Sequence, residues 1–546
     1  MEVKKCLVCK CWFNITDKDI EFYEKVSPIF NWKKYSIPSP RLCSDCRQQR
    51  RLSFRNERSL YKRKCDATGE DIISLYKPTS KYTVYNSDFW WSDQWDAKDY
   101  ARNINIKESF LKQFNELMEI VPQLWMIHIN SYNSDFTSFT LNSNNCYTCS
   151  WVVNSEDCLY SQFLKWCNNV LDSLMVYNSE QCYQGIDSHN CYGCNNFIRS
   201  TDCKNCYFIS DCIECENCID CSNLIWKKYY YKNEYVGKEK IEEIIRKWVH
   251  KEENTSEFYK YANIQQSENC TWDAILSSKN CSHCFDIIDV EDSKYVYFTP
   301  HGRDSYDCTY TSPTWVEYCY EVCSSMWNNF YTTFRCWEWY KNFYSVWCDN
   351  CENIFWCTGL RNQKYCILNK QYTKEEYETL VPKIIEKMKE DWEWWEFFPS
   401  SMSPFWYNET VANEYFPLTK TEALDKWFNW SDYETPFPKV AKIIPANKLP
   451  RDITEIPDDI LNWAIECEIT KKPFRIIKPE LEFYRKHNLP IPKRHPDQRH
   501  LDRMSLRNPR KLYERNCDKC SKNIESTYAP ERKETVYCES CYNNQI

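Results

Sequence analysis

Residues 145–223 read NCYTCSWVVNSEDCLYSQFLKWCNNVLDSLMVYNSEQCYQGIDSHNCYGCNNFIRSTDCKNCYFISDCIECENCIDCSN. A short cue of the form Ser-x-(Asn/Asp/Gln)-Cys recurs in and around this stretch. Its clearest copies are Ser143/Cys146, Ser155/Cys158, Ser179/Cys182, Ser188/Cys191 and Ser200/Cys203, and it returns at Ser267/Cys270, Ser278/Cys281 and Ser305/Cys308. Short strands between polar turns, with small thiols at like positions, predict a parallel β-solenoid. The cues recur every 9–12 residues, so we expect two such units in a coil of about 20 residues.

A longer repeat overlies the short one. Residues 223–248 and 359–388 each run from a Lys-Tyr pair through a short strand into a charged helix, and Thr373 with Glu376 predicts a capping box for the second helix. We therefore expect two tandem solenoid halves, residues 131–250 and 251–390, each ending in a helix. The second half is heavily aromatic, which suits either stacking of bases or sugars or simply core packing.

The segments beside the solenoid carry weaker signals. A helix at about 107–120, stopped by Pro122, predicts that residues 90–130 form a helical cap over the first coil that follows. Residues 391–450 are rich in proline and aromatic residues and predict an ordered linker. Thr419 and Glu422 predict the start of a short helix within it.

The role expected of the cysteines depends on the cellular compartment of the protein. The first residues, MEVKKCLVCKCWF, contain no apolar leader, and no apolar run reaches about 18 residues, so we expect a cytoplasmic protein without a membrane span. In a reducing compartment most of the 35 Cys are expected to be metal ligands or small buried apolar residues. Only six Gly are present, and no phosphate-binding loop or dinucleotide fingerprint is found.

Two pairs of CxxC knuckles predict two structural zinc ions per chain. Cys6, Cys9, Cys43 and Cys46 form the first set, with Cys11 beside it, and Cys517, Cys520, Cys538 and Cys541 form the second. Four reduced core cysteines are the alternative at either place. At the N-terminus the second knuckle runs into a helix-compatible segment, an order that suggests a treble-clef finger.

The two ends of the chain are copies of one two-finger module. Residues 507–541 align without a gap on residues 55–89, with 16 identical pairs. The module at 1–89 keeps its first metal set, and the module at 451–546 keeps its second. The degenerate sets are Cys65, Thr68, Asn86 and Phe89 in the first module and Cys467, Thr470, His495 and Gln498 in the second.

Each module also carries an arginine stripe at helical spacing. The stripes comprise Arg47, Arg51, Arg55 and Arg58, and Arg499, Arg503, Arg507 and Arg510. Residues 41–64 and 485–515 each have a local charge of +7, whereas the whole chain has a net charge of −8. Guanidinium groups in a row suit phosphate, so we predict nucleic-acid binding here. A solvated face, or one docked on acidic parts of the same chain, is the alternative.

Cys212, Cys215, Cys218 and Cys221 have a spacing that approaches that of ferredoxins. The fourth ligand interval and the following residue do not match. We therefore weigh an iron–sulfur cluster against a ladder of thiols, and favour the ladder.

The phrases CRQQRRLSFRNERSLYKRKCDATGEDIISLY, VYNSDFWWSDQWD, SPFWYNETVANEYFPLTKTEAL and VYCESCY carry a resemblance. The chain resembles, over its whole length, a family of uncharacterised cysteine-repeat, zinc-ribbon-like proteins of small-genome candidate-phylum bacteria. The resemblance implies paired zinc fingers around a Cys-rich repeat, and it implies no activity. Members sometimes carry a CoA-transferase label, which nothing in this sequence supports.

The first functional hypothesis is a zinc-stabilised, non-enzymatic binding protein whose Arg stripes engage RNA or the ribosome. The alternative is an intracellular protein-interaction scaffold whose zinc modules cap an acidic solenoid. A redox, iron–sulfur or carbohydrate-acting enzyme is the least favoured, because the chain has eight His, no nucleophile motif and no distinctive carboxylate pair.

Overall fold

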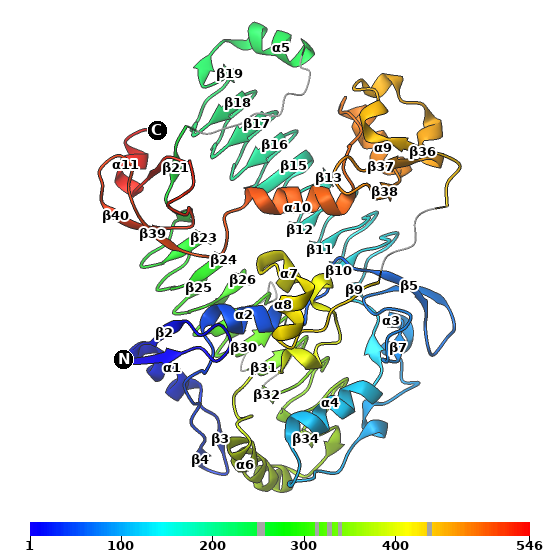
Figure 1. Ribbon diagram of the computed structural model, residues 1–546, viewed down its shortest axis with the longest axis vertical. Coiled ribbons are helices and arrows are strands. Elements are labelled where there is room, and N and C mark those ends of the chain that lie inside the picture. The colour runs from blue at the N-terminus through cyan, green and yellow to red at the C-terminus, as the bar shows by residue number, and fades with distance from the viewer. Residues whose placement is uncertain (248–256, 312–315, 325–329, 337–340, 434–438) are drawn as a thin grey trace. The chain divides into compact units, whose positions relative to one another are not determined.

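The computed structural model describes residues 1–546 apart from 248–256, 312–315, 325–329, 337–340 and 434–438. The chain divides into two compact units, each assembled from segments that lie far apart in the sequence. Unit 1 comprises Met1–Ile127, Lys260–Ser431 and Pro509–Cys541, and unit 2 comprises His128–Tyr259, Asp432–Asn508 and Tyr542–Ile546. Each unit contains one ladder of parallel strands, and finger-module segments pack on it (Figure 1).

The predicted parallel β-solenoid is confirmed, but its coil is shorter than expected. In unit 2, Ser138 pairs with Ser150 and Ser150 with Gln162, so equivalent residues lie 12 positions apart. The expectation of about 20 residues per coil is wrong, because the polar cue marks a turn after every three residues. The sheet consists of β9 (His128–Ile129), β10 (Ser138–Leu141), β11 (Ser150–Val153), β12 (Gln162–Lys165), β13 (Asn168–Leu171), β14 (Leu174–Tyr177), β15 (Glu180–His189), β16 (Asn195–Ile198), β17 (Tyr207–Ser210), β18 (Ile219–Ser222), β19 (Tyr230–Tyr231) and β20 (Glu234–Tyr235).

Four triplets build each 12-residue coil. Every third residue from Asn130 to Lys232 has a φ between 45° and 63°. This left-handed conformation costs a side chain about 1–2 kcal/mol, and Asn and Asp tolerate it better than most residues. In the inner coils the residue after a left-handed one points into the coil, as Cys146 and Cys149 do after Asn145 and Thr148. In the cue Ser-x-(Asn/Asp/Gln)-Cys, the Ser and Cys side chains therefore point into the coil, residue x points outward, and the Asn, Asp or Gln has the left-handed conformation.

Backbone N–H groups explain why Ser and Cys recur at inward positions. Where the inward side chain 12 positions earlier is Ser or Cys, the N–H of an inward residue can donate to it. Cys146 N–H donates to Ser134 Oγ at 3.2 Å, and Ser161 N–H donates to Cys149 Sγ at 3.4 Å. A buried N–H without a partner is costly. Ser and Cys are small side chains that can accept this bond inside a narrow coil.

The solenoid of unit 1 follows the same rule with irregular coils. Paired residues lie 11 positions apart at Ile264 and Ile275, but 14 apart at Tyr306 and Tyr320. Its main sheet consists of β22 (Ile264–Gln265), β23 (Trp272–Leu276), β24 (Cys284–Ile288), β26 (Tyr297–Thr299), β28 (Tyr306–Thr309), β30 (Tyr320–Cys323), β31 (Phe330–Phe334), β32 (Asn342–Phe343), β33 (Ile354–Phe355), β34 (Cys366–Ile367) and β35 (Lys370–Gln371). A second side is formed by β25 (Val290–Glu291), β27 (Gly302–Arg303) and β29 (Val316–Glu317).

A helix follows each solenoid, as predicted. These helices are α5 (Lys238–Lys247) in unit 2 and α6 (Lys374–Glu390) in unit 1. The predicted capping boxes are present at the starts of α6 and of α8 (Lys420–Asp425). The expected boundary between the halves, at residues 250 and 251, lies outside the described residues.

The helical cap does not pack where its place in the sequence predicted, which was over the first coil that follows it. It contains α4 (Phe110–Ile120) and follows α3 (Ser87–Trp90), the last element of the N-terminal finger module. Within unit 1, the ring of Phe114 lies 5.1 Å from that of Trp356, and Arg361 donates to the carbonyl of Trp95 at 3.1 Å. The cap therefore covers late coils of the unit 1 solenoid, although the chain continues from it into β9 of unit 2.

The internal duplication is visible element by element. The N-terminal copy consists of β1 (Glu2–Lys5), β2 (Trp12–Ile15), α1 (Asp17–Val26), α2 (Ser44–Leu52), β5 (Tyr61–Lys64), β6 (Asp71–Ser74), β7 (Val84–Tyr85) and α3. The C-terminal copy consists, in the same order, of β37 (Ala464–Glu466), β38 (Pro473–Phe474), α9 (Lys478–Lys486), α10 (Pro496–Leu506), β39 (Tyr513–Asn516), β40 (Asn523–Ser526), β41 (Val536–Tyr537) and α11 (Glu539–Asn543). The remaining strands and α-helix are β3 (Ile29–Phe30), β4 (Lys33–Lys34), β8 (Gln123–Leu124), β21 (Tyr259–Lys260), α7 (Val411–Tyr415) and β36 (Ile443–Pro445).

The left-handed positions make a prediction about stability. Replacing Asn145, whose φ is 54°, with Val is expected to lower the free energy of unfolding by about 1–2 kcal/mol. The control is Asn145→Gly, which also loses the hydrogen bond to Asp157 at 3.0 Å but accepts a positive φ. Denaturant unfolding measures both, and equal losses would contradict the backbone explanation.

Candidate metal centres and arginine clamps

The N-terminal thiol set is assembled by a hairpin and a helix start. Cys6 and Cys9 lie in the turn between β1 and β2, Cys43 directly precedes α2, and Cys46 lies in the first turn of that helix. The four sulfurs all lie within 4.8 Å of one another, and those of Cys9 and Cys43 are 3.5 Å apart. Cys11 lies close by, with its sulfur 2.9 Å from that of Cys9.

The second set repeats this arrangement. Cys517 and Cys520 lie between β39 and β40, whereas Cys538 and Cys541 lie at the start of α11. Their sulfurs also lie within 4.8 Å of one another, and those of Cys520 and Cys538 are 3.6 Å apart. Among the described residues, these two sets are the groups of metal-binding side chains that converge in this way.

Both sets fit a tetrahedral metal. Zinc–sulfur bonds of about 2.3 Å place the sulfurs of a tetrahedral site about 3.8 Å apart. Contacts inside each set separate the pKa values of neighbouring thiols. The hydrogen bond between Cys43 and Cys46 lowers the pKa of Cys43 to about 7 and raises that of Cys46. The backbone N–H of Cys541 lowers the pKa of Cys538 to about 6, whereas desolvation raises the pKa of Cys541 to about 12. Thiolates are the form that binds metal, so one thiol of each set is shifted toward that form.

The degenerate sets are closed by hydrogen bonds instead. The amide oxygen of Asn86 accepts from the N–H of Phe89 at 2.9 Å and thereby caps α3. The N–H of Asn86 donates to Cys65 Sγ at 3.3 Å, as the N–H of Cys538 donates to Cys517 Sγ at 3.2 Å in the complete set. The second degenerate set also uses a cap.

In that set, His495 Nδ1 accepts from the N–H of Asp497 at 3.2 Å, at the start of α10. Gln498 bonds Asp502 at 2.8 Å, and Thr470 N–H donates to Cys467 Sγ at 3.4 Å. Both degenerate sets therefore retain the hairpin and the helix. A side chain that caps the helix occupies the position that a metal ligand has in the complete set.

The four cysteines of the iron–sulfur alternative are inward members of one coil. Cys212, Cys215, Cys218 and Cys221 are three residues apart, so they occupy its four successive inward positions. Each thiol donates to a carbonyl two residues earlier, for example Cys221 to Ile219 at 3.1 Å. They are not among the thiol groups that converge on a single ion, and their inward positions, with each thiol bonded to a backbone carbonyl, are those of a thiol ladder.

The N-terminal arginine stripe is buried against the solenoid of unit 1. Arg47 donates a hydrogen bond to Asp307 at 2.9 Å and forms an ion pair with its other carboxylate oxygen at 2.9 Å, and Arg51 bonds Glu321 at 2.7 Å. The side chain of Arg47 is 3% exposed and that of Arg51 0%. Arg50 joins the cluster by bridging Glu321 at 3.1 Å and Glu396 at 2.8 Å. This cluster holds α2 onto β28 and β30.

The remaining members of that stripe are also engaged or enclosed. Arg55 is buried, bonds Glu57 at 2.8 Å and contacts Ser324. Its guanidinium lies 4.0 Å from the ring centroid of Tyr310. Arg58 is half-buried.

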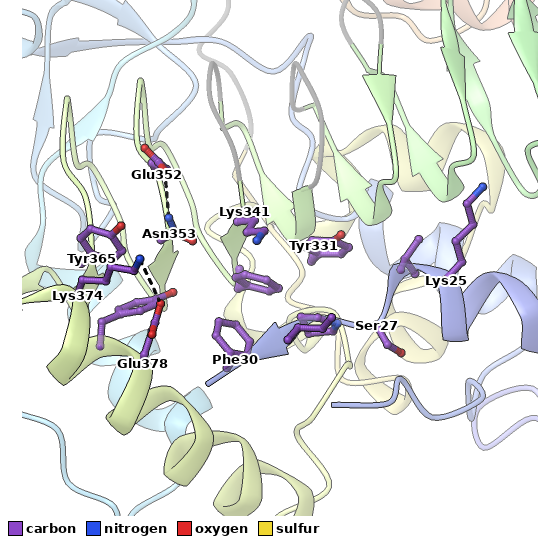
Figure 2. A pocket seen from close by; sticks show the side chains of 15 residues that line it. Lys25, Ser27, Phe30, Tyr331, Lys341, Glu352, Asn353, Tyr365, Lys374 and Glu378 are labelled. Carbon is purple, nitrogen blue, oxygen red and sulfur yellow. Dashed lines mark hydrogen bonds and ion pairs between the residues drawn. The ribbon is translucent and has the colours of Figure 1, made fainter. Parts of the chain in front are cut away.

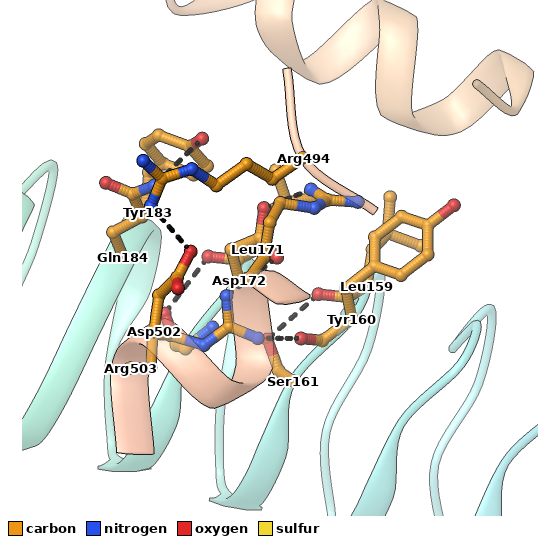
Figure 3. Close-up of polar contacts among 12 residues, drawn as sticks. Leu159, Tyr160, Ser161, Leu171, Asp172, Tyr183, Gln184, Arg494, Asp502 and Arg503 are labelled. Carbon is orange, nitrogen blue, oxygen red and sulfur yellow. Dashed lines mark hydrogen bonds and ion pairs between the residues drawn. The ribbon is translucent and has the colours of Figure 1, made fainter. Parts of the chain in front are cut away.

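The C-terminal stripe repeats the pattern in unit 2. Arg499 and Arg503 of α10 share the carboxylate of Asp172, which is fully buried. Figure 3 shows Arg503 together with Asp172 and Tyr160. Arg503 also donates to the carbonyl of Tyr160 at 3.0 Å, and Arg499 lies 3.3 Å from Glu480. Farther along, Arg507 bonds Asp187 at 2.9 Å within unit 2.

Arg510, which belongs to unit 1, bonds Asp286 at 2.7 Å and is likewise buried. The sequence indicated the arginines but not their acidic partners. Asp172, Asp187, Asp286, Asp307 and Glu321 share one feature, a left-handed backbone position in a solenoid. If the positions of the left-handed residues, one in every three, had been known, these acids would have been predicted to point outward.

The comparisons with known proteins add no identity. No family model, no curated protein and no solved structure matches the chain. In the described part of the chain, no helix has the length and apolar character needed to cross a bilayer.

Metal content gives the direct test of the two thiol sets. We expect two zinc ions per chain, with one lost in Cys6→Ser and a different one lost in Cys517→Ser, because each set needs all four thiolates. Elemental analysis of the purified protein measures this. Cys212→Ser is the matched control and should retain both ions; a chain free of metal before and after substitution would contradict both sites.

Proposed function

We propose that this protein is a zinc-stabilised, non-enzymatic scaffold whose finger modules clamp the solenoids and present a surface to partner proteins. The observation that carries this proposal is the burial of both arginine stripes. Arg51 and Arg503 point into clusters with Asp307 and Asp172, so their charge is used inside the molecule. A buried, paired guanidinium is not available to a phosphate unless the clamp opens. RNA or ribosome binding through these stripes stays a prediction.

The two copies of the finger module differ at one strand edge, which supports an interaction role. In the C-terminal copy, β36 lies parallel to β37, and Ala464 N–H donates to the carbonyl of Lys442 at 2.9 Å. Ala464 and Ile465 are both fully buried there. In the N-terminal copy the equivalent strand is β1, which pairs only with β2 among the described residues.

The edge of β1 is also beside exposed apolar side chains. Val3 is 55% exposed and Trp12 69% exposed, and Leu7 in the metal knuckle is 54% exposed. The segment that precedes α2 and its equivalent before α10 are placed alike, because Leu7 N–H donates to the carbonyl of Arg41 as Glu468 N–H donates to the carbonyl of Lys493. Since the C-terminal copy has both this segment and β36, the segment does not take the place of β36 in the N-terminal copy. We propose that β1 takes an extended aliphatic peptide of a partner protein, parallel to it, as β37 takes β36.

The clamp is tested by charge reversal. Arg51→Glu and Arg503→Glu are each expected to destabilise the protein by about 3–5 kcal/mol, because each removes one arginine partner of a buried carboxylate, Glu321 or Asp172, and places a second buried carboxylate beside it. Thermal unfolding measures the loss, and Arg451→Glu, at an exposed position, is the control. RNA retention is measured on the same proteins. Variants that keep full stability but lose bound RNA would overturn the scaffold proposal and favour the RNA hypothesis.

The strand edge is tested with a peptide of known sequence. A synthetic peptide KVAKIIPANKL, which copies residues 439–449, should bind the full chain saturably. Val3→Pro should abolish binding, because it removes the N–H equivalent to that of Ala464. Val3→Thr keeps the N–H and should still bind. Fluorescence anisotropy of the labelled peptide measures this, and equal affinity for all three proteins would exclude the β1 edge.

A further inference from the structure

A cavity of about 410 Å³ lies in unit 1 between the solenoid and the start of α6 (Figure 2). Aromatic residues of its wall such as Phe343 and Tyr377 are buried, so they present almost no surface to a ligand. Charged groups of its lining pair within the protein, as Lys374 and Glu378 do at 3.9 Å. Reactive side chains that do reach solvent lie elsewhere in unit 1, in the N-terminal metal knuckle.

This knuckle contains a fifth thiol beside the four of the metal set. The sulfur of Cys11 lies 2.9 Å from that of Cys9, and Cys11 also interacts with Cys43. Both Cys9 and Cys11 are exposed, whereas Cys6, Cys43 and Cys46 are buried. A tetrahedral ion needs four sulfurs, so one more is present than the ion requires, and it lies against a ligand that reaches solvent.

The backbone of the knuckle recurs four times in the duplicated module. In each knuckle the N–H of the first cysteine donates to the carbonyl of the residue five positions later, and the residue just before that one has a φ between 59° and 73°. The residues five positions after the first cysteine are Cys11, Glu70, Lys472 and Lys522. Of these four positions, only the first carries a thiol.

The degenerate knuckle of the N-terminal module shows where a side chain at this position points. Glu70 Oε2 accepts from Thr68 Oγ1 at 3.2 Å and from the amide of Asn86 at 2.8 Å. Thr68 and Asn86 stand at the second and third ligand positions of that set. Glu70 therefore contacts the same two positions as Cys11 does in the complete set. The shape of the knuckle, rather than the identity of the side chain, directs this position at the ligands.

We propose that Cys9 and Cys11 form an oxidation site, in which a hydroperoxide converts the two thiols to a disulfide and thereby opens the N-terminal metal set. The sulfur of Cys9 attacks the hydroperoxide and its O–O bond breaks, which leaves a sulfenic acid on Cys9 and releases water or an alcohol. The sulfur of Cys11 then attacks that of Cys9, the S–O bond breaks, and hydroxide leaves as water with the proton of Cys11. Two thiols are oxidised and one hydroperoxide is reduced.

The disulfide removes one of the four ligands of the first set, so this set is expected to lose its ion. The C-terminal set lacks the second reactant. Cys520 is exposed, as Cys9 is, but Lys522 stands where the first knuckle has Cys11. Loss of the ion rests on the proposed zinc sites, whereas the disulfide forms with or without zinc.

The proposal is tested on the full zinc-loaded chain with one equivalent of hydrogen peroxide. We expect release of one of two zinc ions, measured with a chromogenic chelator, and a disulfide between Cys9 and Cys11, located by tandem mass spectrometry. The metal-free chain should form the same disulfide, so a failure of the zinc sites and a failure of this pair are separate results. No disulfide, or disulfides that omit Cys11, would overturn the proposal.

Two matched variants move the fifth thiol. Cys11→Ser keeps all four ligands, so it should bind two zinc ions and release the first about tenfold more slowly than the unmodified chain, because the oxidised Cys9 loses its neighbouring thiol. Lys522→Cys adds a thiol at the equivalent position of the second set and should make that set release its ion as fast as the first. Equal release from the unmodified chain and Cys11→Ser, or an unchanged second set in Lys522→Cys, would overturn the assignment.

Discussion

The structure depends on a backbone that enters the left-handed region at every third residue. This conformation closes a coil in 12 residues, and it leaves the N–H of inward residues such as Cys146 and Ser155 directed at an inward side chain of the previous coil rather than at a backbone carbonyl. Such groups need an acceptor inside a space too narrow for large side chains. Ser and Cys meet both demands, so the abundance of cysteine in the solenoids follows from hydrogen bonding and size. Disulfide or metal chemistry is not required to explain it.

The same constraint organises the outer surface. A left-handed residue points outward, and Asn and Asp tolerate this conformation well. A solenoid built this way therefore carries rows of short polar side chains at fixed spacing. Where Asp stands in such a row, as at Asp172 and Asp307, it offers a rigid carboxylate to a helix laid across the coils. The arginine stripes use these carboxylates, since an i, i+4 spacing brings two guanidinium groups to one acid.

Sequence patterns predicted the features that are encoded locally. The converging thiols, the capping boxes of Thr373 and Thr419, and the solenoid itself all follow from short motifs. The coil length did not, because aromatic residues such as Trp166 and Phe208 also occupy left-handed positions and hide the triplet. Tertiary partners were out of reach for a different reason. Asp307 lies 260 residues from Arg47, and nothing near either residue specifies the other.

Charge balance explains why a count of basic residues overstates the basic surface. Residues 485–515 carry a local charge of +7, yet Arg499 and Arg503 are neutralised by Asp172 and Glu480. The N-terminal cluster matches Arg47, Arg50 and Arg51 with Asp307, Glu321 and Glu396. Buried ion pairs contribute little net stability but penalise any arrangement that leaves one member alone. Because each cluster contains equal numbers of acids and bases, the pairing specifies where its helix docks. Both copies of the module share this arrangement.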